Sequence, residues 1–202
     1  MIKSIFFLLT LCFVACQSEK TKLPILGTPD IIGEDTLFPS IPDFDFLDQQ
    51  HKLVNEHTFH NKIYVTDFMF LTCPTICPKM TNEMNKVYKH YESNNNILFL
   101  SHTIDPENDS IPLLLSHANQ LKVNHSKWHF VTGKKKQIYD LAENSYFSAA
   151  YEDSTAPGGF VHSGGLLLID KYKHIRGVYD GTNPRETSKL IADIHSLLLE
   201  QF

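Results

Sequence analysis

The chain has 202 residues, of which 42% are apolar and 20% are charged, and its formal net charge at pH 7 is −5. These values are typical of a single globular domain with a hydrophobic core, and they exclude a disordered or fibrous chain. Proteins that bind nucleic acid usually carry a basic excess or stripe, whereas the basic run found here is the short Lys134–Lys136. We therefore expect no nucleic-acid partner.

The first fifteen residues have the pattern of a secretory signal. One basic residue, Lys3, precedes about a dozen apolar residues, fewer than the roughly 20 that span a bilayer as a helix. Ala15 stands directly before Cys16, as at a bacterial lipoprotein cleavage site, where the cysteine becomes the lipidated first residue. We expect residues 1–15 to be a signal peptide and Cys16 to carry a lipid, which would hold the body on a membrane, outside the cytoplasm and facing the periplasm. An uncleaved membrane anchor is the alternative.

The rest of the chain divides into a tether and one domain. Residues 16–40 contain three prolines and two glycines with little apolar periodicity, which predicts a tether. From residue 41 to the end, apolar runs of strand type alternate with amphipathic runs of helix type. The expected strands are one around Phe44 and Phe46, and then 63–71, 97–103, 128–132, 164–170 and 175–179; the expected helices are 78–91, 111–121, 134–144 and 184–199.

This order of elements predicts the fold class. Strands that alternate with helices, followed by a C-terminal hairpin and a last helix, form an α/β protein with a mixed central sheet flanked by helices. The arrangement fits a thioredoxin-like fold, and residues 41–202 would form it as one domain.

Two cysteines stand where a buried strand turns into a helix. Cys73 and Cys77 are separated by three residues, and Pro78 suits the first turn of the helix that follows. Unpaired N–H groups at a helix N-terminus lower the pKa of a thiol. The two sulfurs could close a disulfide or bind one metal ion, and two thiolates suit Cu(I) or zinc. The alternative without a functional role is a structural disulfide or two inert thiols.

A nearby imidazole would complete a site with three ligands, and His162 is the candidate among 11 histidines. It precedes the apolar strand 164–170, in a segment rich in glycine that can approach the cysteine loop closely. Spacing alone favours a different interpretation, in which His162 is a loop histidine whose hydrogen bonds are satisfied and which binds no metal. A third segment, Thr103–Pro112, follows a strand and precedes a helix; Asp109 or Ser110 would cap that helix, and Asp105 could position a partner or a metal-binding loop.

These three segments together resemble the Sco/SenC family of thioredoxin-fold proteins. The matching motifs are Cys-Pro-x-x-Cys-Pro from Cys73 to Pro78, Thr-Ile-Asp-Pro-Glu-x-Asp from Thr103 to Asp109, and a His-Ser pair before an apolar strand, from His162 to Asp170. The resemblance covers residues 41–200. It implies that Cys73, Cys77 and His162 are copper ligands and that the two cysteines interconvert between dithiol and disulfide. Val161 departs from the family, which often has an acidic residue there.

The resemblance implies a copper-binding assembly factor that delivers copper to the copper-site subunit of a cytochrome c oxidase, for its binuclear centre. Two other functions stay open: a thiol–disulfide oxidoreductase that reduces the cysteines of a copper-site partner, and a thiol peroxidase. Oxidoreductases of the thioredoxin type usually have two residues between their cysteines and a proline in the facing loop. Here there are three residues, and His162 occupies that place. Two thiolates and one imidazole favour copper over zinc, which usually takes four ligands in structural sites. The sequence therefore favours a metallochaperone over an enzyme.

Overall fold

The computed structural model describes residues 22–202, and the predicted alternation of strands and helices is confirmed. The helices are α1 (Cys77–Tyr91), α2 (Ile111–Leu121), α3 (Lys135–Asn144) and α4 (Pro184–Gln201). The strands of the main sheet are β3 (Asp45–Asp48), β4 (Leu53–Asn55), β5 (Ile63–Met69), β6 (Ile97–Thr103), β7 (Trp128–Thr132), β10 (Gly165–Ile169) and β11 (Ile175–Asp180).

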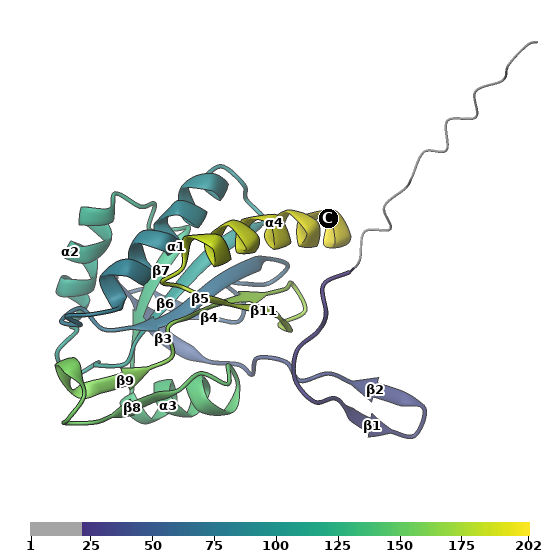
Figure 1. The fold of residues 1–202 in the computed structure, drawn as a ribbon, viewed down its shortest axis with the longest axis horizontal. Coiled ribbons are helices and arrows are strands. Elements are labelled where there is room, and N and C mark those ends of the chain that lie inside the picture. Colours follow the sequence, from purple (N-terminus) through teal and green to yellow (C-terminus); the bar gives the residue numbers. More distant parts are fainter. Residues whose placement is uncertain (1–21) are drawn as a thin grey trace, which may run out of the picture.

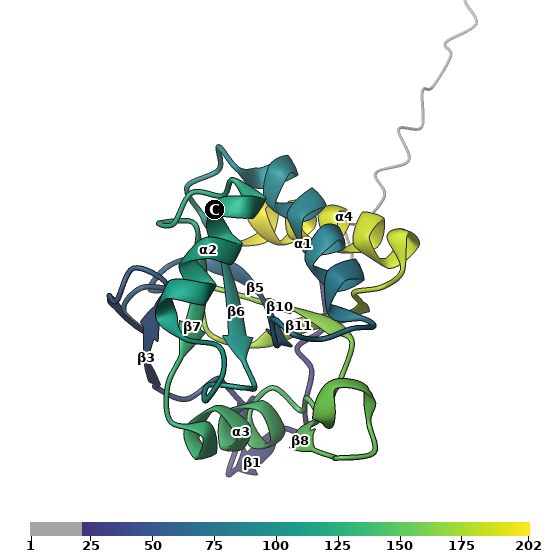
Figure 2. The same cartoon turned by 90° about the vertical axis from the view of Figure 1, so that its left-hand side faces the viewer.

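The main sheet has seven strands in the order β11-β10-β5-β6-β7-β3-β4. Strands β5, β6 and β7 pair in parallel, whereas β10, β11, β3 and β4 pair antiparallel with their neighbours. Helices α1, α2 and α4 lie on one side of the sheet, and α3 lies on the other (Figures 1 and 2). The mixed sheet flanked by helices, with a hairpin and a helix at the C-terminus, confirms the expected fold class.

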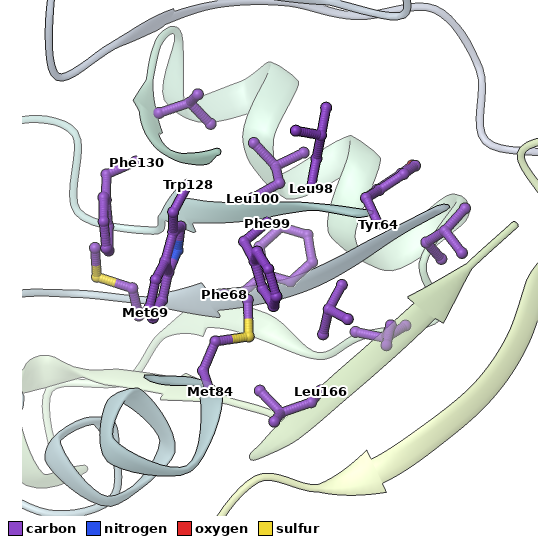
Figure 3. Close-up of a cluster of buried hydrophobic side chains, with 14 of the residues drawn as sticks. Tyr64, Phe68, Met69, Met84, Leu98, Phe99, Leu100, Trp128, Phe130 and Leu166 are labelled. Carbon is purple, nitrogen blue, oxygen red and sulfur yellow. The ribbon is translucent and has the colours of Figure 1, made fainter. Parts of the chain in front are cut away.

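The core forms around the two central strands, which are covered by helices on both sides. Every residue of β5 and β6 is buried, as expected for parallel strands whose two faces both contact helices. Figure 3 shows large side chains of this core, among them Phe99, Trp128 and Met84. Fully burying a side chain of this size stabilises a fold by roughly 1.5–3 kcal/mol. Strand β5 ends at Met69, so the core holds the start of the cysteine loop in place.

Two small hairpins lie outside the main sheet, and the sequence patterns predicted neither of them. The first joins β1 (Asp30–Ile32) to β2 (Asp35–Leu37), is exposed throughout and projects from the domain (Figure 1). The second joins β8 (Ala150–Glu152) to β9 (Phe160–His162) and contains a 3-10 turn at Pro157–Gly159. Strands of three residues are too short to produce a recognisable alternation.

Part of the expected tether contacts the domain. The Leu26 N–H donates to the Ile175 carbonyl at 2.8 Å, and the Arg176 guanidinium donates to the carbonyls of Leu23 and Pro24. Cys16 and the expected signal peptide lie outside the described residues. Within residues 22–202, none of the helices has both the length and the apolar character that a membrane span needs.

Candidate metal centre

The cysteine loop connects the central strand β5 to helix α1. Cys77 is the first residue of α1, and Pro78 occupies the first turn, where its missing N–H leaves no hydrogen bond unmade. Cys73 lies in the loop and is 7% exposed, and Cys77 is 5% exposed. Both are free thiols. The predicted placement of the pair between a buried strand and an amphipathic helix is therefore confirmed.

The structure brings His162 to the two cysteines. One ligand atom from each of Cys73, Cys77 and His162 lies within 4.8 Å of the other two. The closest approach is 3.1 Å, between Cys77 Sγ and His162 Nε2. The Cys77 N–H also points at Cys73 Sγ, at 3.5 Å. Cys77 and His162 are 85 residues apart in sequence, so only the fold can bring them together.

The two thiols differ in acidity. Burial alone would raise the pKa of Cys73, but hydrogen bonds from the Cys77 side chain, the Thr75 and Cys77 N–H groups and the Thr75 hydroxyl together hold it below its usual value. Burial raises the pKa of Cys77 well above its usual value, and the interaction with Cys73 adds to this shift. Cys73 is therefore the thiol that more readily becomes a thiolate.

His162 presents a free nitrogen to the sulfurs. Its Nδ1 lies 3.2 Å from the Ser163 carbonyl, which can only accept a hydrogen bond, so Nδ1 carries the proton. Burial lowers the pKa of His162, which keeps the ring neutral. The Nε2 lone pair then faces Cys77 Sγ. His162 is the last residue of β9 and so lies in a strand, which corrects the prediction of a loop histidine. The Ser163 carbonyl is thus the hydrogen-bond partner of Nδ1.

Asp109 holds the start of the cysteine loop. Its carboxylate accepts the Leu71 N–H at 3.1 Å and the Thr103 hydroxyl at 2.5 Å. Ser110 occupies the predicted N-cap position of α2, but its side chain makes no capping hydrogen bond. Asp109 does not cap the helix and bonds the cysteine loop instead. Asp105 accepts hydrogen bonds from the Asn108 amide. The local sequence contains no signal for the bond to Leu71, which lies 38 residues away.

The hairpin that carries His162 packs against the cysteine loop through a glycine. Gly158 has a φ of +82°, a backbone conformation that L side chains rarely adopt. A Cβ atom at this position would lie 2.9 Å from the Phe70 ring and 3.1 Å from Pro74. The Phe70 ring also packs against Phe160 in a tilted arrangement and edge-to-face against His162, with ring centroids 5.0 and 5.9 Å away. The distance between the imidazole and the sulfurs therefore depends on contacts between the hairpin and the loop.

A buried carboxyl group also influences this site. Asp67 lies on β5 and is 1% exposed, and its Oδ1 has no hydrogen-bond partner among the described residues. Burial raises the pKa of Asp67 to about 6, although a hydrogen bond with Ser101 opposes the shift. In its charged form, Asp67 contributes to the raised pKa of Cys77. Nothing in the sequence pattern distinguished this residue from other residues of a buried strand.

The arrangement supports two kinds of chemistry. Two sulfurs and one imidazole nitrogen within reach of a single ion form a donor set that soft metal ions prefer, and the incomplete shell leaves a position open for a ligand from another protein. Two adjacent thiols with different acidity can also form and break a disulfide. The residues therefore fit either a metal ion or a reversible disulfide.

Comparisons with known proteins identify the class and then the family. The fold is thioredoxin-like, with two cysteines between β5 and α1 and a histidine of β9 beside them. The sequence profile of the SCO1/SenC family matches residues 35–199. The chain belongs to this family, and the predicted resemblance is confirmed.

Solved structures of Sco proteins are similar to this chain. A SCO1/SenC family lipoprotein from Bacillus anthracis superposes with a TM-score of 0.72 and is 27% identical, and the match covers 79% of this chain and 95% of that one. BsSco, described as a member of the Sco family of cytochrome c oxidase assembly proteins with a disulfide switch, has a TM-score of 0.68 and is 26% identical, with 79% and 93% covered. ScoI of Bradyrhizobium japonicum, solved with copper bound, has the same fold at a TM-score of 0.63 and 18% identity, with 76% and 98% covered.

Proposed function

We propose that this protein binds copper through Cys73, Cys77 and His162 and delivers it to the copper-site subunit of a cytochrome c oxidase during assembly of the binuclear copper centre. The observation that carries the proposal is the group of three ligand atoms within 4.8 Å of one another. Membership of the SCO1/SenC family supports it, since a relative is described as an oxidase assembly protein.

The donor set explains the choice of metal. Two thiolates and a neutral imidazole suit Cu(I), whereas structural zinc sites usually have four protein ligands. A shell of three ligands also suits a protein that passes its metal on, because an incoming ligand can bind before one of the three leaves. We propose copper as cargo on these grounds.

A titration of the fully reduced protein with Cu(II), and with Cu(I) under anaerobic conditions, tests the proposal. We expect one equivalent to bind, with an absorption band from thiolate-to-copper charge transfer in the Cu(II) form. Cys73→Ser, Cys77→Ser and His162→Ala should each abolish tight binding while circular dichroism still reports a folded protein. Binding by His162→Ala as tight as by the unaltered protein would contradict the set of three ligands.

A second candidate function is thiol–disulfide exchange with a copper-site partner. The different acidity of Cys73 and Cys77 favours it, because an attacking thiolate and a buried second thiol are the parts that a redox pair needs. BsSco, the relative described with a disulfide switch, also favours it. If the protein bound no stoichiometric copper but formed a reversible Cys73–Cys77 disulfide, this candidate would replace the first.

We also propose that the protein works outside the cytoplasm, held on a membrane by a lipid on Cys16. The apolar segment before Cys16 and a relative described as a lipoprotein support this location. Mass spectrometry of the protein purified from membranes tests it: the N-terminal peptide should begin at Cys16 and carry acyl chains. Cys16→Ser should release the protein from the membrane fraction or leave its signal peptide uncleaved.

A further inference from the structure

A cavity of about 220 Å³ lies beside the cysteine pair, between the cysteine loop, α1 and α2. Cys73 and Cys77 form part of its wall, together with Met69, Asn85 and His117. His162 is not among the residues that line it, although its Nε2 lies 3.1 Å from Cys77 Sγ. The cysteines therefore face two different groups of side chains.

His117 contributes a nitrogen that the protein does not use. Its Nε2 is buried and has no hydrogen-bond partner within residues 22–202, and the same is true of Asn85 Oδ1. A buried polar atom without a partner destabilises the fold, so such atoms call for an explanation. The His117 ring packs edge-to-face on Phe130, with centroids 5.2 Å apart. Burial lowers the pKa of His117, which keeps the ring neutral.

The other walls indicate what could bind. No Asp, Glu, Lys or Arg is among the residues that line the cavity. A hard or strongly hydrated cation would find no carboxylate there, and an anion would find no basic side chain. Thr81, Asn82 and Asn85 bring neutral oxygen donors to the cavity. The soft donors are two thiols and the Met69 thioether, and His117 adds a neutral imidazole. Thioether, thiolate and imidazole together are donors that Cu(I) accepts.

We propose that this cavity holds a second position for Cu(I), in which one cysteine thiolate binds the ion together with Met69 Sδ and His117 Nε2. The proposal rests on copper binding at Cys73 and Cys77. Movement between the two positions is a ligand exchange at constant oxidation state: the bond from copper to His162 Nε2 breaks, and a bond to His117 Nε2 forms, while a cysteine sulfur stays bound throughout. His117 would then hold the ion while the side facing β9 is vacated.

X-ray absorption spectroscopy of the full-length His162→Ala variant tests this second position, at a Cu(I) concentration high enough to load the weaker binding that remains. We expect a sulfur shell and a persisting imidazole signal, which His117 supplies. Adding His117→Gln, which keeps a polar side chain of similar length, should remove the imidazole signal. In competition with a chromophoric Cu(I) chelator, it should also lower the affinity for Cu(I) by about tenfold or more, the scale of loss that even outer-shell changes reach. Met69→Leu conserves volume and should lower the affinity in the same direction.

His195→Gln in the same background is the matched control, because His195 lies exposed on α4; it should change neither the spectrum nor the affinity. The proposal is overturned if His162→Ala and its double variant with His117→Gln have the same spectrum and affinity. If the unsubstituted protein binds copper normally, that result leaves the proposed function intact. If the unsubstituted protein binds no copper at all, both proposals are wrong.

Discussion

At the scale of single residues, Cys73 and Cys77 share one loop but have different surroundings. Cys73 receives several hydrogen bonds that stabilise its thiolate, whereas burial dominates at Cys77. Because the thiolate is the reactive form, the two should differ in reaction rate near neutral pH. We predict that iodoacetamide modifies Cys73 before Cys77 in the reduced protein, with a pH midpoint below that of an ordinary thiol. Mass spectrometry of timed samples measures both rates.

Cys77→Ala provides the control for this prediction. It removes a side-chain hydrogen bond to Cys73, so the pH midpoint for alkylation of Cys73 should rise. Equal rates at the two cysteines of the unaltered protein would contradict the prediction.

Asp67 should make stability fall with rising pH. Its pKa is raised from 3.8 to about 6 in the fold, so between these values the folded protein holds a proton that the unfolded chain has lost. Stability therefore decreases as pH rises from about 4 to about 6, and the loss is complete above this window, at up to about 3 kcal/mol. Asp67→Asn should remove this dependence and stabilise the protein at pH 7, as measured by urea unfolding at several pH values. Asp30→Asn, on the exposed hairpin, should leave the dependence unchanged.

The candidate site was only partly predictable at this scale. Cys73 and Cys77 stand out because thiols at a strand-to-helix junction are uncommon and chemically meaningful. His162 required the family motif, since 11 histidines compete for the same role. The contacts of Asp67, Asp109 and His117 could not be predicted, because the sequence does not reveal which distant groups surround a side chain.

At the scale of elements, the loop between β5 and α1 is held by a hydrogen bond to a second loop, the one between β6 and α2. Asp109 accepts the Leu71 N–H and thereby ties the cysteine loop to the segment between β6 and α2. We predict that Asp109→Ala leaves this buried donor without a partner and lowers the free energy of unfolding by roughly 1–3 kcal/mol. Hydrogen exchange at the Leu71 amide should become faster by a similar free energy. Asp109→Asn keeps an acceptor and should be milder; an equal effect of both variants would argue against this bond.

The bounds of an element were predictable where its apolar pattern extends over many residues. Strand β6, helix α2 and strand β7 have the expected bounds, because an apolar run or an apolar period marks each of them. The β8–β9 hairpin was missed since its strands are short and its connection contains Gly158 and Gly159, which the pattern assigns to a loop.

At the scale of the whole molecule, Arg176 joins the edge strand β11 to three other parts of the fold. Its guanidinium donates to Asp170 at 2.9 Å, to Glu200 of α4 at 3.0 Å and to the carbonyls of Leu23 and Pro24. Arg176 is 4% exposed and Asp170 is 1% exposed. Removing one partner of a buried ion pair lowers the free energy of unfolding, because the other charge stays buried without a counter-charge.

We predict that Arg176→Ala destabilises the protein by about 3–5 kcal/mol and frees residues 23–26 from the domain. Urea unfolding measures the first effect, and limited proteolysis near Gly27 measures the second. Lys173→Ala is the comparison, because its ion pair with Asp43 is exposed and should contribute little. A loss below 1 kcal/mol for Arg176→Ala would contradict this account. The contact between residues 23–26 and β11 was not predictable, since a segment rich in proline resembles a tether whether or not it packs.

The rigidity of the β8–β9 hairpin would affect how tightly the candidate metal centre binds an ion. Two of the proposed ligands belong to a loop and helix anchored in the core, and the third ends a hairpin of three-residue strands outside the main sheet. A metal ion bound to all three would act as a cross-link, closing the chain between Cys77 and His162 much as a disulfide does. Part of its binding free energy would then be spent on restricting the hairpin. The affinity for metal would therefore report hairpin rigidity, and a change such as Gly158→Ala, which touches no ligand, would release metal more readily.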